Sequence, residues 1–87
     1  MARVTIYSTA TCPICVKTKT LLTQLNIPYD EIRVDQDQTG LRAMQAITQN
    51  ARTVPQIVID HRWIGGFSEL TELDMDGELD GLKSPAT

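Results

Sequence analysis

Two cysteines three positions apart constrain this chain more than any other feature of its sequence. Cys12 and Cys15 follow residues 3–7, which alternate polar and apolar side chains as a strand does. Pro13 suits the first turn of a helix, and apolar residues recur at helical spacing from there to Leu25. The pair is therefore predicted to lie where a strand gives way to a helix.

The rest of the pattern predicts the element order β-α-β-α-β-β-α. Strands are expected at residues 3–7, 29–34, 56–59 and 63–64, and helices at residues 13–25, about 41–50 and 68–73, with a last helical piece up to Leu82. An alternating start implies a parallel pair of strands, and the late hairpin adds antiparallel ones. We predict an α/β fold in which a four-stranded mixed β-sheet is flanked by helices on both faces.

Some single residues within these elements carry expectations of their own. Thr11 and Ser68 are the expected N-caps of the first and third helices. Met44 and Met75 are expected to fill the core, and Trp63 is expected to be a partly buried strand residue.

Length and charge limit the class of protein. A chain of 87 residues is expected to form one domain, residues 1–87, with a frayed tail at residues 83–87. Its formal net charge of −3, with scattered basic residues, argues against nucleic acid as a partner. No apolar stretch approaches the roughly 18 residues that cross a bilayer, and no signal peptide is recognisable. We therefore expect a cytoplasmic monomer that does not associate with membranes.

The cysteine pair predicts disulfide chemistry with two different sulfurs. The thiolate is the nucleophile of disulfide exchange, so such a site must stabilise negative charge on one sulfur. At the start of a helix, free backbone N–H groups and the helix dipole favour that charge on Cys12. Cys15 lies one turn further on the same side, close enough to form a disulfide. We predict that Cys12 is exposed and attacks, and that Cys15 is more buried, protonated, and resolves the mixed disulfide.

Two plainer interpretations of the cysteine pair compete with this one. A structural zinc site needs four ligands, and the chain offers two cysteines and one distant histidine, His61. Alternatively, both cysteines are buried and act as small apolar residues. The position of the pair, after a strand and at the start of a helix in a βαβ unit, favours a redox-active dithiol over both.

Two further motifs have both an ordinary and a functional interpretation. The Thr-Val-Pro motif of residues 53–55 precedes an expected strand, and only about 5–6% of X–Pro bonds are cis, so a trans bond is the default. A cis bond would instead aim the Val54 backbone at an extended peptide. The Gly-Gly-Phe-Ser motif of residues 65–68 fits an ordinary hairpin exit and helix start, and equally a helix N-terminus that binds a carboxylate.

Together, Cys12-Pro13-Ile14-Cys15 and these two motifs resemble a dithiol glutaredoxin of the thioredoxin-like superfamily, and the resemblance covers residues 4–82. It implies a thioredoxin-like fold, a cis bond before Pro55, and glutathione as cosubstrate, with no tightly bound cofactor and no metal. It also implies that Cys12 forms the mixed disulfide with the glutathione sulfur, that the Val54 backbone pairs with the cysteinyl part, and that the helix start takes the γ-glutamyl carboxylate. The residues implied to bind glutathione are Ile14, Arg52, Thr53, Val54, Pro55, Gly66, Phe67 and Ser68.

Two positions depart from the family pattern. Many relatives carry Tyr where this chain has Ile14, and many carry Lys where it has Thr9. We expect weaker glutathione binding without loss of activity, because screened surface charges act modestly.

The resemblance implies glutathione-dependent reduction of protein disulfides and of glutathione mixed disulfides. The expected partners are glutathione and disulfide-containing or glutathionylated proteins, with ribonucleotide reductase among the candidate targets. Three alternatives stay open: a redoxin fed by thioredoxin reductase, an iron–sulfur cluster carrier in which Cys12 and glutathione hold the cluster between two chains, and a non-catalytic binding module.

Overall fold

The computed structural model describes residues 2–83 and has the predicted order of elements. The strands are β1 (Val4–Ser8), β2 (Tyr29–Arg33), β3 (Gln56–Ile59) and β4 (Arg62–Gly65). The helices are α1 (Pro13–Gln24), α2 (Gln38–Ile47) and α3 (Phe67–Met75), followed by the short 3-10 helix η1 (Asp80–Leu82). No helix in this part of the chain is long and apolar enough to cross a membrane. Most of the tail predicted to fray, residues 84–87, lies outside the described residues.

The strands form one mixed sheet in the order β2-β1-β3-β4. β1 runs parallel to β2 and antiparallel to β3, and β3 pairs with β4 in an antiparallel hairpin. The predicted four-stranded mixed sheet is thus confirmed. Since β1 is a central strand, the loop that follows it leaves the middle of the sheet, and that loop carries the first cysteine into α1.

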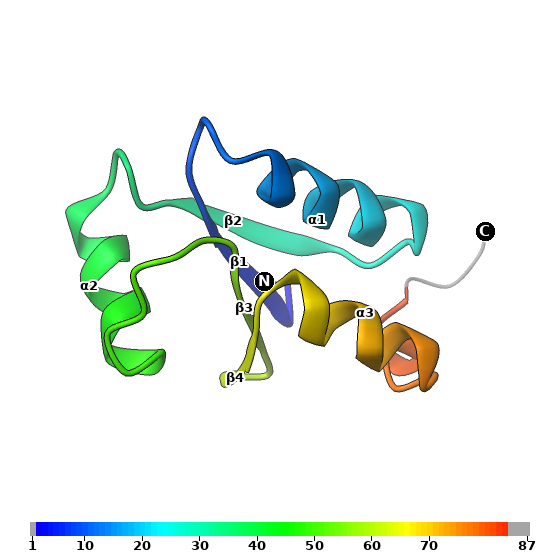
Figure 1. Ribbon diagram of the computed structural model, residues 1–87. Helices are drawn as coiled ribbons and strands as arrows, with labels where there is room; N and C mark the ends of the chain where they lie inside the picture. The colour runs from blue at the N-terminus through cyan, green and yellow to red at the C-terminus, as the bar shows by residue number, and fades with distance from the viewer. Residues whose placement is uncertain (1, 84–87) are drawn as a thin grey trace.

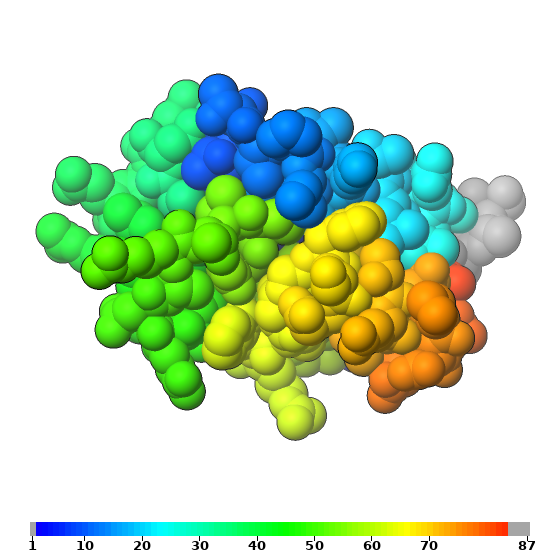
Figure 2. Space-filling model, viewed as in Figure 1, coloured from blue at the N-terminus to red at the C-terminus, as the bar shows by residue number. Residues whose placement is uncertain are grey.

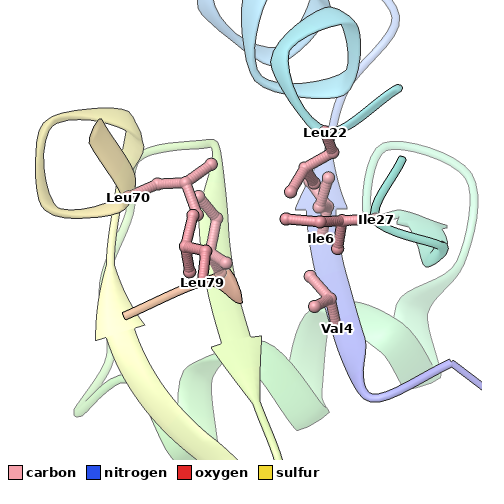
Figure 3. Packing of buried hydrophobic residues seen from close by; sticks show 7 residues of the cluster. Val4, Ile6, Leu22, Ile27, Leu70 and Leu79 are labelled. Atoms are coloured by element: carbon pink, nitrogen blue, oxygen red, sulfur yellow. The ribbon is translucent and has the colours of Figure 1, made fainter. Parts of the chain in front are cut away.

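Helices cover both faces of the sheet, as predicted, with α2 on one side and α1 and α3 on the other (Figure 1). Side chains of β1 and β3 alternate between the faces, so each strand contributes to two cores. The larger core lies under α1 and α3 and contains Val4, Ile6, Leu22, Ile27, Ile57, Leu70 and Leu79 (Figure 3). The smaller core, under α2, contains Tyr7, Met44 and Val58.

Three local predictions are wrong. The N-cap of α1 is Cys12 and not Thr11, because the sulfur of Cys12 itself caps the helix. The N-cap of α3 is Gly66, and Ser68 is the second residue of that helix. Met75 is the last residue of α3 and is 84% exposed, so it does not fill the core.

Candidate active site

Cys12 stands between β1 and α1 with an extended backbone, at φ −105° and ψ 105°. Its Sγ accepts a hydrogen bond from the backbone N–H of Cys15 at 3.1 Å, so the sulfur does what a side-chain oxygen does in an ordinary N-cap. Pro13, at the first helical position, has no N–H that needs a partner. The sulfur is therefore held by an amide at the positive end of the helix dipole, an arrangement that stabilises a thiolate.

Cys15 lies one turn along α1 and is 0% exposed. Burial raises the pKa of its thiol from 9.0 to about 12, and the hydrogen bond and charge of Cys12 add to the rise. The Thr9 backbone and the Lys19 ammonium oppose it, without cancelling it. Cys15 is therefore a protonated thiol at neutral pH, as its predicted burial implies.

The Thr-Val-Pro motif lies directly against Cys12. The Cys12 thiol donates a hydrogen bond to the Val54 carbonyl oxygen, with sulfur and oxygen 3.6 Å apart. The Val54–Pro55 peptide bond is cis, as the family resemblance implies. The contact with Val54 also explains why Cys12 is half-buried and less open than the sequence predicts.

A groove of about 340 Å³ lies between the Thr-Val-Pro segment and the start of α3; Cys12 does not line it but contacts Val54, which does. The start of α1, the segment before β3 and the start of α3 gather on one face of the molecule (Figure 2). The groove is lined by Ile14, Thr53, Val54, Pro55, Gln56, Trp63, Gly65, Gly66, Phe67, Ser68 and Glu69. It thus brings together all the residues implied to bind glutathione except Arg52, which is exposed and does not line it.

The start of α3 forms the far end of the groove and already carries a carboxylate of the protein. The Gly66 backbone N–H donates to Glu69 Oε1 at 2.7 Å, which is the bond that the N3 glutamate makes to the N-cap amide in a capping box. The next two residues, Phe67 and Ser68, are the first two of the helix, where amides have no intrahelical partner. Of the three amides at residues 66–68 that the sequence offers to a ligand carboxylate, those of Phe67 and Ser68 remain available.

Close backbone approach explains the paired glycines of the same motif. Gly65 has φ +115°, a conformation that side chains rarely adopt, and a Cβ there would lie 2.6 Å from Glu69 Oε1. A Cβ on Gly66 would lie 3.3 Å from the Pro55 carbonyl oxygen. Gly66 therefore lets the start of α3 pass close to the Thr-Val-Pro segment, and Gly65 leaves room for the Glu69 carboxylate.

Sequence reasoning missed Gln56 and Glu69 as groove residues, and it expected Trp63 only as a partly buried strand residue, whereas Trp63 is 40% exposed and lines the groove. A polar residue at the head of the apolar run of β3 was the available signal for Gln56, because a buried amide needs hydrogen-bond partners. Those partners are Thr53 and Trp63. The spacing of Gly66 and Glu69 was the signal for the capping box.

A separate polar network, whose residues do not line the groove, joins β1, β2 and α1. Glu31 Oε2 accepts a hydrogen bond from the fully buried Ser8 hydroxyl at 2.5 Å, and pairs with Lys19 Nζ at 2.8 Å. These two contacts hold the pKa of Glu31 below its usual value. No group of three or more histidine, cysteine, aspartate or glutamate side chains placed to hold a metal occurs in residues 2–83.

Comparisons with known proteins agree on one family. The glutaredoxin family model matches residues 4–64. A glutaredoxin of Neisseria meningitidis serogroup A is 41% identical over 86 residues, which is 98% of this chain and 100% of that protein. The solution structure of a dithiolic glutaredoxin from Trypanosoma brucei brucei superposes with a TM-score of 0.80 at 38% identity, over 95% of this chain and 88% of that one. A buckwheat glutaredoxin in complex with glutathione gives a TM-score of 0.81 at 29% identity, over 95% of this chain and 83% of that one.

Proposed function

The chain belongs to the glutaredoxin family and is a thiol–disulfide oxidoreductase; from that premise we propose that it uses glutathione to reduce protein disulfides and glutathione mixed disulfides. One observation carries the proposal. The Cys12 sulfur accepts a hydrogen bond from the Cys15 amide and lies against Val54, a residue that lines the groove, with a buried thiol one helical turn further along α1.

The first step is an attack by the Cys12 thiolate on one sulfur of the substrate disulfide. A new disulfide forms between Cys12 and that sulfur, and the other substrate sulfur leaves as a thiolate. With a glutathionylated protein, attack on the glutathione sulfur releases the protein thiol and leaves glutathione on Cys12. A second glutathione thiolate then attacks the bound glutathione sulfur, so glutathione disulfide leaves and the Cys12 thiolate is regenerated.

The second cysteine supplies a different exit for protein disulfides. Once a substrate sulfur is bound to Cys12, the Cys15 sulfur attacks the Cys12 sulfur, and the Cys15 proton goes to the departing substrate sulfur. The substrate leaves as a dithiol, and a disulfide forms between Cys12 and Cys15. Two glutathione molecules then reduce that disulfide and become glutathione disulfide, so the electrons balance. Since the pKa of the Cys15 thiol is about 12, this cysteine is protonated in the reduced protein; the hydrogen bond and charge of Cys12 that contribute to the shift are lost once Cys12 is in a disulfide.

The groove supplies groups that fit the glutathione peptide. The Val54 backbone, next to Cys12, would pair with the cysteinyl part of glutathione. The free amides at Phe67 and Ser68 would take the γ-glutamyl carboxylate at the positive end of α3. Glu69 contributes a negative charge near these amides that suits the α-ammonium of the same γ-glutamyl group. The related buckwheat protein was solved as a glutathione complex, which supports glutathione as the ligand.

The test is an assay that couples glutathione, glutathione reductase and NADPH to the reduction of a mixed-disulfide substrate. We expect turnover with the wild-type protein and none with Cys12→Ser. Cys15→Ser is expected to keep deglutathionylation and to lose reduction of a protein disulfide. If Cys15→Ser lost both activities equally, the division of roles would be wrong, and turnover by Cys12→Ser would overturn the proposed function.

A further inference from the structure

A row of hydrogen bonds along the groove links three residues, from the edge strand β4 to the Thr-Val-Pro segment. Trp63 Nε1 donates to Gln56 Oε1 at 2.8 Å. Gln56 Nε2 in turn donates to the Thr53 carbonyl oxygen at 2.9 Å and to Thr53 Oγ1 at 3.2 Å. All three residues line the groove, although they come from β4, β3 and the loop before β3.

The chemistry of the donors fixes the direction of these hydrogen bonds. An indole N–H only donates, so the Gln56 amide must turn its oxygen toward Trp63. Its NH2 group is then forced toward Thr53, where it meets two acceptors. Gln56 is 6% exposed, so water does not substitute freely for either partner. Losing the Trp63 indole or reversing the Gln56 amide would leave part of this buried amide without a partner, whereas Trp63 and Thr53 are themselves exposed.

At their Thr53 end, these hydrogen bonds hold the backbone beside Cys12. The Thr53 carbonyl that Gln56 holds belongs to the peptide unit that ends at the Val54 nitrogen, and the next carbonyl accepts from Cys12 Sγ. The Thr53 hydroxyl accepts from Gln56, so its own hydrogen is free to be donated elsewhere. A shift of the Gln56 amide would therefore rotate the Val54 backbone, which is the group proposed to pair with glutathione.

The structure assigns Gln56 and Trp63 as positioning residues that hold the Thr53–Val54 peptide in the orientation that binds the glutathione backbone. The assignment rests on the proposed function, because it names how this chain presents the same groove. Neither side chain contacts the Cys12 sulfur, whose one link to them is the Val54 carbonyl, so the larger effect should fall on glutathione binding and a much smaller one on the reactivity of Cys12.

Gln56→Glu is the sharpest perturbation because it keeps the size of the side chain. A carboxylate still accepts from Trp63, but it cannot donate to Thr53 and places a second acceptor against the carbonyl oxygen. We expect KM for a glutathionylated peptide to rise about ten-fold, the consequence of a buried acceptor left unpaired. The alkylation rate of Cys12 by iodoacetamide, which does not use the groove, should change far less than KM, because the Cys15 amide still holds the sulfur. Gln38→Glu makes the same chemical change at an exposed residue of α2 and should leave both rates unchanged.

A second pair of variants keeps the test informative if Gln56→Glu folds poorly. Gln56→Leu removes the hydrogen bonds to both Trp63 and Thr53, whereas Trp63→Phe removes only the indole donor that orients the Gln56 amide. Because both act on one hydrogen-bonded chain, the double variant should raise KM no more than Gln56→Leu alone. Fully additive effects of the two substitutions would refute the assignment.

The single tryptophan supplies a readout that does not depend on turnover. Trp63 is the only tryptophan of the sequence, so fluorescence reports the indole at the edge of the groove without interference. In a Cys15→Ser background, formation of the Cys12–glutathione mixed disulfide should change its emission, and Gln56→Leu should abolish most of that change. If wild type turns over but Gln56→Glu and Gln56→Leu keep the wild-type KM, the positioning role is wrong while the proposed function stands. If wild type shows no glutathione-dependent turnover, the proposed function fails first.

Discussion

The pKa of Cys15 sets how this residue should respond to an alkylating reagent. Iodoacetamide reacts with the thiolate, and the thiolate fraction falls ten-fold for each pH unit below the pKa. With a pKa of about 12 in place of 9.0, the Cys15 thiolate at about pH 8 is about a thousand-fold rarer than that of an ordinary thiol. Zero exposure of the side chain slows the reaction further.

The assay is a time course of alkylation of the reduced protein, followed by intact mass and peptide mapping from about pH 7 to about pH 10. We expect one adduct per chain, on Cys12, across this range. The rate at Cys15 should keep rising with pH, without a plateau near 9.0. In Cys12→Ser, Cys15 should react somewhat faster than in wild type, because the hydrogen bond and charge of Cys12 are lost while burial, the largest cause of the shift, remains.

Denatured protein provides the reference, since both cysteines should then react as ordinary thiols. A plateau of the Cys15 rate near pH 9.0 in the folded protein would refute the reasoning, because it would show an unperturbed thiol. Reaction of Cys15 as fast as in the denatured chain would refute its burial as well.

Three further predictions concern the stability of the fold. The unfolded chain releases the Cys15 proton near pH 9.0 and the folded chain near about 12, so the free energy of unfolding should fall as pH rises through that window. Urea titrations over this range should show a shallower decline for Cys15→Ala than for wild type. Equal slopes for the two proteins would contradict this linkage. Leu22→Ala should lower the free energy of unfolding by about 2–5 kcal/mol, because this side chain has 0% exposure in the larger core. Leu21, on the same helix, is only partly buried, so Leu21→Ala should cause less than half of that loss. Similar losses for the two variants would mean that the packing of α1 is misplaced. Glu69→Ala removes the acceptor of the Gly66 amide and should lower the free energy of unfolding by about 1 kcal/mol. Glu69→Gln keeps an acceptor and should lower the free energy of unfolding by less. Equal melting temperatures for the two variants would show that this hydrogen bond contributes nothing.

Periodicity in the sequence predicted the fold well because the sheet and its two helical layers bury alternating stripes. The apolar positions of β1 and β3 face both cores, and the helical stripes of α1 and α2 face one core each. The N-caps were harder to predict. Thr11 is a more usual N-cap residue than Cys12, and only the path of the backbone shows that the sulfur replaces the hydroxyl.

The contacts across the groove could not be predicted from spacing. Gln56 and Trp63 are seven residues apart, on strands whose pairing shifts register between Ile57 and Val58. A register shift of this kind changes which side chains meet across a hairpin, and no local pattern in the sequence predicts it. Glu69 was missed for a related reason, because its partner is a glycine amide and a capping box is usually recognised from the side chain at the N-cap.

The chemical difference between the two cysteines, by contrast, follows from helix geometry alone. Cys15, Thr18 and Leu22 stand at i, i+3 and i+7 on α1, and all three are 0% exposed, so they form the stripe that faces the sheet. The residues beside that stripe, Ile14 and Val16, are 48% and 55% exposed. A C-x-x-C pair that opens such a helix must therefore place its first sulfur at the free amides of the N-terminus and its second in the core. Any change that rotates α1 on the sheet, such as a one-residue insertion between Cys12 and Cys15, would move the second thiol off this stripe and remove the pKa shift that keeps it protonated.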